Sequence, residues 1–252
     1  MSALSNSTPA TAPVALITGA SSGIGEAIAR RFAALGYRVL SAQRRLAPVG
    51  ETLSSSLLDP GAAETLAQAV AATTDRLDVL VNNAGMMLEG SLTESSQADW
   101  DQQLHLNLTV PFTLTRALLP MLRASKGSIV NISSVEASAS NPRHAAYCAS
   151  KAGIEGLTRA IAIDEGPNGV RCNAVAPGWI DTPLNLEFIQ SLTGDVEAFH
   201  AGLKAIHPVG RTGAPEEVAA AVVWLASEAA SFTTGQVLTV DGGRTAKLSL
   251  PS

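Results

Sequence analysis

The chain has 252 residues, of which 46% are hydrophobic and 15% are charged, and this composition excludes disorder for most of its length. Its formal net charge of −5 argues against a nucleic-acid-binding protein, and no apolar run is long enough to predict a membrane span. Residues 1–13 contain no Lys or Arg and do not resemble a targeting peptide, so we expect a disordered N-terminal tail there, and residues 247–252 are expected to form a C-terminal tail.

Two cysteines, Cys148 and Cys172, are too few for a disulfide framework. Neither they nor the four histidines have metal-ligand spacing, so we expect no metal site. Free thiols are typical of a reducing compartment, which predicts a cytoplasmic protein.

Apolar runs that predict buried strands alternate with stretches of helical periodicity. In chain order they are strand 14–17, helix 24–35, strands 37–42 and 53–58, helix 62–73, strand 77–81, helix 99–122, strand 128–132, helix 146–165, strand 170–175, helix 216–226 and strand 237–240. Gly36 ends the first helix, and Pro111 marks a kink or boundary in the third. Strands that are apolar nearly throughout predict a parallel sheet covered on both faces. We expect a single α/β domain over 14–246, with a Rossmann-type doubly wound fold and a seven-stranded parallel sheet.

Residues 184–207 stand outside this alternation, between the sixth strand and the last helix. Doubly wound sheets bind ligands beyond the carboxyl ends of their strands, and an insertion there would overhang the ligand. We therefore expect 184–207 to form a substrate lid.

A glycine-rich turn follows the first expected strand. Residues 18–25 read Thr-Gly-Ala-Ser-Ser-Gly-Ile-Gly and lead directly into a helix. Glycines let the backbone approach a ligand closely, and the free amides at a helix N-terminus attract negative charge. The absence of Gly-Lys-Ser/Thr excludes a Walker-type triphosphate site. The turn predicts a pyrophosphate site at Gly19, Gly23 and Gly25, although taken alone it could be a tight connection.

The second expected strand distinguishes between two cofactors. Dinucleotide domains that prefer NAD place an Asp or Glu about 20 residues further on, where it binds the ribose 2′-hydroxyl. Residues 38–45 contain no carboxylate, whereas Arg44, with Arg45 beside it, would bind a 2′-phosphate. The alternative is that these arginines are only solvated surface. We expect NADP(H) rather than NAD(H).

Tyr147 and Lys151 are four residues apart at the start of an expected helix, so they share one face. A tyrosine has an ordinary pKa of about 10, and one ammonium about 4 Å away would be enough to stabilise its phenolate near neutral pH. Ser134, at the carboxyl end of strand 128–132, could hold a carbonyl oxygen beside that phenol. Asn107 lies among leucines, where a buried amide needs a hydrogen-bond partner. These residues predict a general acid/base site.

Together the motifs resemble the short-chain dehydrogenase/reductase family over residues 14–246. They are the turn at 18–25, Asn82-Asn-Ala-Gly85, Asn107, Ser134, Tyr147-x-x-x-Lys151 and Pro177-Gly178. The resemblance implies that Ser134 orients the substrate oxygen, Tyr147 exchanges the proton, and Lys151 lowers the tyrosine pKa and binds the nicotinamide ribose. It implies that Asn107 holds a water molecule that links the lysine to solvent.

The same resemblance implies a set of cofactor contacts. They are Gly19, Ser21, Ser22, Gly23, Ile24, Gly25, Arg44, Asp59, Asn83, Ala84, Gly85, Tyr147, Lys151, Pro177, Gly178, Ile180 and Thr182. Among them, Asp59 would contact the adenine, Asn83 and Gly85 the middle of the cofactor, and Ile180 and Thr182 its nicotinamide end.

Three residues are expected on the substrate side. Glu136, two positions after the serine, would select a cationic or hydroxyl-rich substrate or would simply face water. His144 would touch substrate or lie on the surface, and Trp179 would lie near the nicotinamide or the substrate. Cys148 is expected in the core, and the methionines at 86–87 pack there or line the pocket.

The sequence thus predicts an NADP(H)-dependent oxidoreductase acting on a small carbonyl or secondary alcohol, with Tyr147 as general acid/base. The family likeness further suggests a homotetramer assembled through helices 99–122 and 146–165, with neither nucleic acid nor a membrane as partner. The alternatives are an NAD(H)-dependent alcohol dehydrogenase of the same family, a catalytically silent dinucleotide-binding regulatory module, and a nucleotide-binding transferase.

Overall fold

The structure is a computed structural model that describes residues 12–191 and 195–247. Most of the two expected tails and positions 192–194 of the expected lid therefore lie outside the described residues. Within these ranges, no helix has both the length and the apolar character needed to cross a membrane.

Seven parallel strands form one sheet in the order β3-β2-β1-β4-β5-β6-β7. Their bounds are β1 Val14–Thr18, β2 Arg38–Gln43, β3 Glu51–Ser54, β4 Val79–Asn82, β5 Ser128–Ile132, β6 Arg171–Pro177 and β7 Val237–Val240. The order reverses between β1 and β4, and such a reversal is the switch point at which doubly wound sheets bind ligands. The predicted Rossmann-type fold is confirmed.

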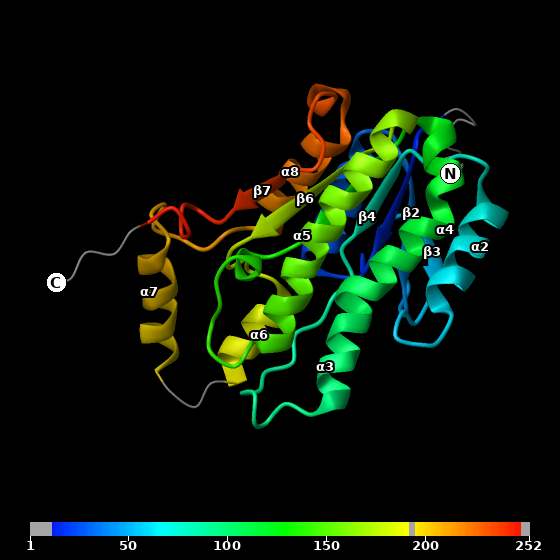
Figure 1. Cartoon of the computed structure of the whole chain (residues 1–252). Coiled ribbons are helices and arrows are strands. Elements are labelled where there is room, and N and C mark those ends of the chain that lie inside the picture. Colours follow the sequence, from blue (N-terminus) through cyan, green and yellow to red (C-terminus); the bar gives the residue numbers. More distant parts are fainter. Residues whose placement is uncertain (1–11, 192–194, 248–252) are drawn as a thin grey trace, which may run out of the picture.

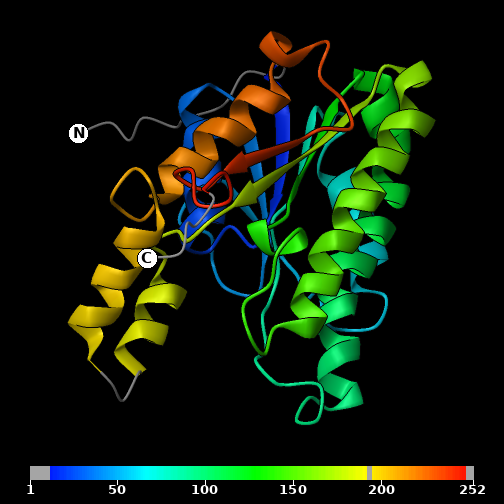
Figure 2. The same ribbon diagram turned by 60° about the vertical axis from the view of Figure 1, so that its left-hand side comes forward.

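Helices cover both faces of the sheet (Figures 1 and 2). Their bounds are α1 Gly23–Ala34, α2 Ala62–Thr73, α3 Gln97–Leu104, α4 Val110–Ser125, α5 Ala145–Glu165, α6 Pro183–Ser191, α7 Val196–Ile206 and α8 Pro215–Ala226. Helices α1 and α8 pack together on one face, and α2, α4 and α5 lie on the other. Helices α6 and α7 extend from the edge of the molecule beyond β6 (Figure 1).

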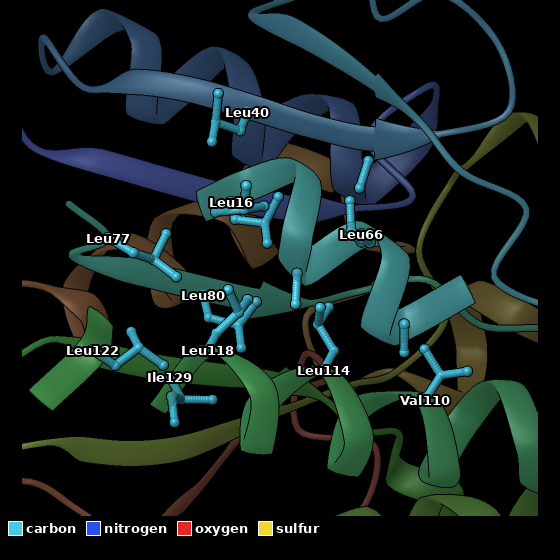
Figure 3. Close-up of a cluster of buried hydrophobic side chains, with 14 of the residues drawn as sticks. Leu16, Leu40, Leu66, Leu77, Leu80, Val110, Leu114, Leu118, Leu122 and Ile129 are labelled. Carbon is cyan, nitrogen blue, oxygen red and sulfur yellow. The ribbon is translucent and has the colours of Figure 1, made fainter. Parts of the chain in front are cut away.

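The alternation of side chains along each strand explains why both faces are apolar. Leu16, Leu40 and Ile129 point into one cluster with α2 and α4, which Figure 3 shows in close-up. Ile17 and Val39 belong to the opposite cluster, under α1 and α8. Every residue of β1, β4 and β5 is buried on one face or the other, so none of these strands can shift its register by one residue without exchanging the two cores.

Two elements differ from the sequence prediction. The third strand is Glu51–Ser54 instead of 53–58, because the chain after it leaves the sheet, and Leu57 reaches the core from a loop. The expected helix 99–122 is divided into α3 and α4 by a π-helical turn at His105–Thr109. Pro111 falls in the first turn of α4, directly after the π-helical turn.

Candidate active site

A cavity of about 460 Å³ lies at the carboxyl ends of the strands. It is lined by the turns that follow β1, β2, β3, β4, β5 and β6, together with α5 and the start of α6. From the expected site residues, the structure brings together Gly19, Ser21, Ser22, Gly23, Ile24, Gly25, Arg44, Asn83, Ala84, Gly85, Ser134, Tyr147, Lys151, Pro177, Gly178, Ile180 and Thr182.

The glycine turn has the shape of a phosphate cradle. Gly19 and Gly23 have φ angles of +69° and +55°, in the left-handed region that L side chains rarely adopt. A Cβ atom on Gly25 would collide with the Gly19 carbonyl oxygen. Ser22 is the N-cap of α1, and its side chain makes no capping hydrogen bond. The amides of the first helical turn are therefore available to an anion in the cavity.

The turn after β4 is fixed to the end of β1. The Thr18 hydroxyl accepts hydrogen bonds from the Asn83 and Ala84 amides, each 3.0 Å long. The Asn83 side chain donates to the carbonyls of Thr18 and Gly19 at 2.9 and 3.1 Å. Asn83 thus builds the wall of the cavity through its amide group.

The end of β2 contributes polar groups to the cavity. Gln43 is 6% exposed, and neither atom of its side-chain amide has a hydrogen-bond partner in the described chain. Arg44 and Arg45 also line the cavity, and among the described residues neither forms a salt bridge. A buried amide without a partner and two uncompensated cations fit a polar anionic ligand such as a phosphorylated ribose.

Asp59 is not where the family likeness placed it. Its side chain is exposed and does not line the cavity. Because β3 ends at Ser54, the residues that reach the cavity are Ser55, Ser56, Leu57 and Leu58. The sequence prediction ended this strand at residue 58. A prediction that ended it at Ser54 would have identified residues 55–58 as the ones that reach the cavity.

Tyr147 and Lys151 project from the first two turns of α5 into the cavity. The Lys151 ammonium lies 5.6 Å from the centre of the tyrosine ring and donates a 2.8 Å hydrogen bond to the Ile132 carbonyl. Ser134 forms a hydrogen bond with Tyr147. Ser133 instead bonds to Glu155 at 2.8 Å, so Ser134 is the serine directed at the phenol.

The two ionisable groups have shifted pKa values. Burial raises the pKa of Tyr147 to about 12; the hydrogen bond with Ser134 opposes this shift, and the charges of Glu136 and Cys148 add to it. Burial lowers the pKa of Lys151 to about 8. We expected Lys151 alone to lower the pKa of Tyr147 to near neutral pH. This does not hold in the chain without cofactor, because desolvation disfavours the charged forms of both residues.

Asn107 lies in the π-helical turn and is 2% exposed. Its side-chain amide donates to the Met86 carbonyl and the Ser150 hydroxyl at 2.9 and 3.0 Å, and its oxygen accepts from the Met86 amide at 2.9 Å. A Cβ atom on Gly85 would lie 3.2 Å from the Asn107 oxygen and 3.6 Å from the Lys151 nitrogen. Asn107 therefore connects the turn after β4 to α5 beside the lysine, although it does not itself line the cavity.

Glu136 and His144 pair with each other rather than lining the cavity. The His144 Nδ1 lies 2.8 Å from a Glu136 carboxylate oxygen, and Glu136 also accepts from the Asn141 side chain at 2.9 Å. His144 is 8% exposed, so the alternative of a surface histidine is wrong. Cys148 is half-buried, with its sulfur 3.2 Å from the Ser140 hydroxyl. Its predicted place in the core is also wrong, because this side of α5 faces the loop at 135–144.

The aromatic residue after β6 packs against α6 and α7. Trp179 does not line the cofactor cavity; its ring centre lies 6.3 Å from that of Phe188 on α6 and 6.0 Å from that of Phe199 on α7. From the segment that follows Trp179, the residues that line the cavity include Thr182, Pro183 and Asn185. The cavity also includes several side chains that sequence reasoning missed or left open: Gln43, Arg45, Met86, Met87, Leu106 and Ile132.

Comparisons with known proteins agree with this geometry. The family described as "Enoyl-(Acyl carrier protein) reductase" matches residues 19–245. The D-threitol dehydrogenase of Mycolicibacterium smegmatis is 38% identical over 249 residues, covering 93% of each chain. The ligand-free aldohexose dehydrogenase of Thermoplasma acidophilum has a TM-score of 0.89 and 35% identity, over 97% of this chain and 99% of that one.

A further solved structure contains a dinucleotide. It is described as an NAD(P)-dependent gluconate 5-dehydrogenase from Beutenbergia cavernae with NADP bound at low occupancy. It has a TM-score of 0.85 and 36% identity over 93% of this chain and 97% of that one.

Proposed function

Because this chain belongs to the short-chain dehydrogenase/reductase family of oxidoreductases, whose members bind a nicotinamide dinucleotide, we propose that it interconverts a carbonyl and a secondary alcohol with NADP(H). The observation that carries the proposal is that Ser134, Tyr147 and Lys151 line one cavity together with the glycine turn. Similarity to the D-threitol and aldohexose dehydrogenases favours small hydroxyl-bearing substrates.

The chain's own residues handle the substrate oxygen and its proton. When bound, the nicotinamide supplies or accepts the hydride at the substrate carbon. In reduction, Ser134 donates a hydrogen bond to the carbonyl oxygen and the Tyr147 hydroxyl gives up its proton to that oxygen. In oxidation, the phenolate accepts the proton of the alcohol. Lys151 stabilises the phenolate, because its ammonium is the positive charge nearest the ring.

The preference for NADP(H) rests on the end of β2. Arg44 lines the cavity without an acidic partner in the described chain, and no carboxylate stands on β2 or in the arginine pair that follows it. Charge-assisted hydrogen bonds from a guanidinium favour a 2′-phosphate over a 2′-hydroxyl. The NADP found in the structurally similar gluconate 5-dehydrogenase supports the same preference.

Two accompanying features belong to this proposal. The family likeness favours a homotetramer assembled through the helical face that carries α4 and α5. The unpaired thiols Cys148 and Cys172 favour a reducing, cytoplasmic location.

Tyr147→Phe tests the catalytic assignment. We expect turnover of polyols, aldoses or ketones with NADP(H) to fall by about 10²- to 10⁴-fold, the range typical of general acid/base groups, while NADPH still binds. Ser133→Ala is the matched control, because its hydroxyl bonds to Glu155, and it should retain most of the activity. Full turnover by Tyr147→Phe would contradict the mechanism. Tight NADPH binding without turnover on any carbonyl, alcohol or acyl thioester would favour the regulatory module instead.

A further inference from the structure

A buried carboxylate and an imidazole form a pair at the start of α5. Glu136 lies in the short helical turn Val135–Ala137 after β5, and His144 is the N-cap residue of α5. The His144 Nδ1 lies 2.8 Å from the Glu136 carboxylate, and their side chains are only 10% and 13% exposed. Neither residue lines the cavity that contains Tyr147 and Lys151.

The position of Glu136 is fixed from several directions. The backbone amide and side-chain amide of Asn141 donate to its carboxylate at 3.3 and 2.9 Å. Arg244, from the C-terminal segment, in turn donates to the Asn141 oxygen at 3.3 Å. A carboxylate that accepts this many hydrogen bonds is held in one place.

His144 is held on its other side by the loop after β4. Its Nε2 lies 3.6 Å from the Glu89 carboxylate, and its backbone forms a β-bridge with Gly90. The preceding residue, Arg143, has a φ angle of +70° and forms a 2.6 Å ion pair with Glu94. The imidazole therefore sits between two carboxylates, with Glu136 as the closer partner.

Tyr147 lies one helical turn beyond this pair. The rings of His144 and Tyr147 meet edge to face with their centres 6.3 Å apart. The charge of Glu136 adds to burial in raising the pKa of Tyr147. Two other ionisable groups near Tyr147, Lys151 and Cys148, lie on α5 itself. Two further carboxylates belong to Glu155, which bonds to Ser133, and to Glu89, which lies beside His144.

We propose that the Glu136 carboxylate, held in place by His144, disfavours the phenolate form of Tyr147 and so biases the site toward donating a proton, which is the direction of carbonyl reduction. This inference rests on the proposed function, because it acts through Tyr147 as the acid. Glu136 and His144 are positioning residues in this scheme: one supplies a fixed negative charge and the other anchors it. A protein without that charge should reach the phenolate, and therefore oxidise alcohols, at lower pH.

The chain offers a direct test because it contains only two tyrosines, Tyr37 and Tyr147. In a Tyr37→Phe background, the ultraviolet absorbance of tyrosinate reports Tyr147 alone, without cofactor or substrate. We expect Glu136→Gln to lower the titration midpoint by about one pH unit, because the loss of a nearby negative charge favours the phenolate. Glu136→Asp should restore most of the parent value. Circular dichroism at each pH identifies the range in which the protein stays folded.

Two matched variants separate this charge from its surroundings. Glu89→Gln removes the more distant carboxylate and should move the midpoint far less than Glu136→Gln does. His144→Gln keeps a donor for Glu136 and should stay close to the parent, whereas His144→Leu removes one of its hydrogen-bond partners and should move the midpoint part of the way in the same direction as Glu136→Gln. An unshifted midpoint in Glu136→Gln, or an equal shift in Glu89→Gln, would overturn the inference.

The pH profile of kcat/KM provides the second measurement. It is the decisive one if the protein unfolds at a lower pH than that at which Tyr147 titrates. For alcohol oxidation, Glu136→Gln should move the ascending limb to lower pH, giving up to tenfold higher kcat/KM below the parent midpoint, with a smaller effect on carbonyl reduction. If Tyr147→Phe is inactive and the profiles of Glu136→Gln and the parent coincide, only this inference fails. If Tyr147→Phe is fully active, the proposed function itself fails.

Discussion

Arg44 and Gln43 are neighbours at the end of β2 but contribute differently to the cavity. Arg44 is exposed and charged, while Gln43 is buried and has no amide partner in the described chain. We predict that Arg44→Ala weakens NADPH binding by about 10- to 100-fold, as expected for one charge-assisted contact, and leaves NADH binding unchanged. Fluorescence titration with both cofactors measures this, with Arg30→Ala, whose side chain pairs with Glu26 on α1, as the control. An unchanged dissociation constant for NADPH would remove the argument for a 2′-phosphate site.

Lys151 makes the stability of the protein depend on pH. Burial lowers its pKa to about 8, below the ordinary lysine value of 10.5, so folding disfavours the protonated form. Between these two values the unfolded chain binds the proton and the folded chain does not, so this contribution to the unfolding free energy rises with pH. We predict that wild type gains up to about 3 kcal/mol relative to Lys151→Met between pH 8 and pH 10.5. Urea denaturation at several pH values checks this; a constant difference would show that the ammonium is not desolvated.

Individual residues also mark the limit of sequence reasoning. Tyr147, Lys151 and Ser134 were predicted because a helical repeat and a strand end bring them together over short distances in the chain. The bond between Glu136 and His144 depends on the path of a loop that has no periodicity, and sequence reasoning left both residues with open alternatives. Asp59 was misplaced because the predicted end of β3 was four residues too late. With the strand ending at Ser54, the Asp59 carboxylate lies on the surface instead of in the cavity.

At the level of elements, the glycine turn couples backbone shape to ligand binding. We predict that Gly25→Ala weakens NADPH binding at least tenfold and lowers stability, because its Cβ would collide with the Gly19 carbonyl oxygen and open the turn. Gly156→Ala, in the middle of α5, is the matched control. Its Cβ would approach only the Arg159 side chain, at 4.0 Å, so it should raise stability by about 0.5–1 kcal/mol. Thermal unfolding with and without NADPH distinguishes the two; unchanged NADPH binding in Gly25→Ala would contradict the cradle.

Strands and helices with strong periodicity were the most predictable elements. The bounds of α2, β5 and β7 agree with the sequence prediction, because turn residues and apolar runs mark their ends. The division of helix 99–122 was only partly foreseen, since Pro111 indicated a boundary but not a π-helical turn. That turn depends on tertiary partners: Asn107 bonds to Met86 and Ser150, which lie on other segments.

At the scale of the whole molecule, large apolar side chains remain exposed on the outer helices. Phe112 on α4 is 46% exposed and Ile163 on α5 is 77% exposed. If these helices form the expected tetramer interface, burying such side chains would stabilise it by roughly 1.5–3 kcal/mol each. We predict that Phe112→Glu and Ile163→Glu lower the molecular mass measured by light scattering, while Leu46→Glu, in the loop after β2, does not. A monomeric wild-type protein would contradict the expected assembly.

The cavity wall is drawn from turns that are far apart in the chain, from Gly19 after β1 to Asn185 at the start of α6. A fragment that ended before β6 would therefore lack Pro177, Gly178, Ile180 and Thr182 of this wall and could not form the complete cavity. A bound cofactor accordingly stabilises the native state against global unfolding by RT ln(1 + [L]/Kd). In a cell, the ratio of cofactor concentration to its dissociation constant would thus help determine how long each molecule survives proteolysis, which connects the lifetime of the protein to the nucleotide pool it uses.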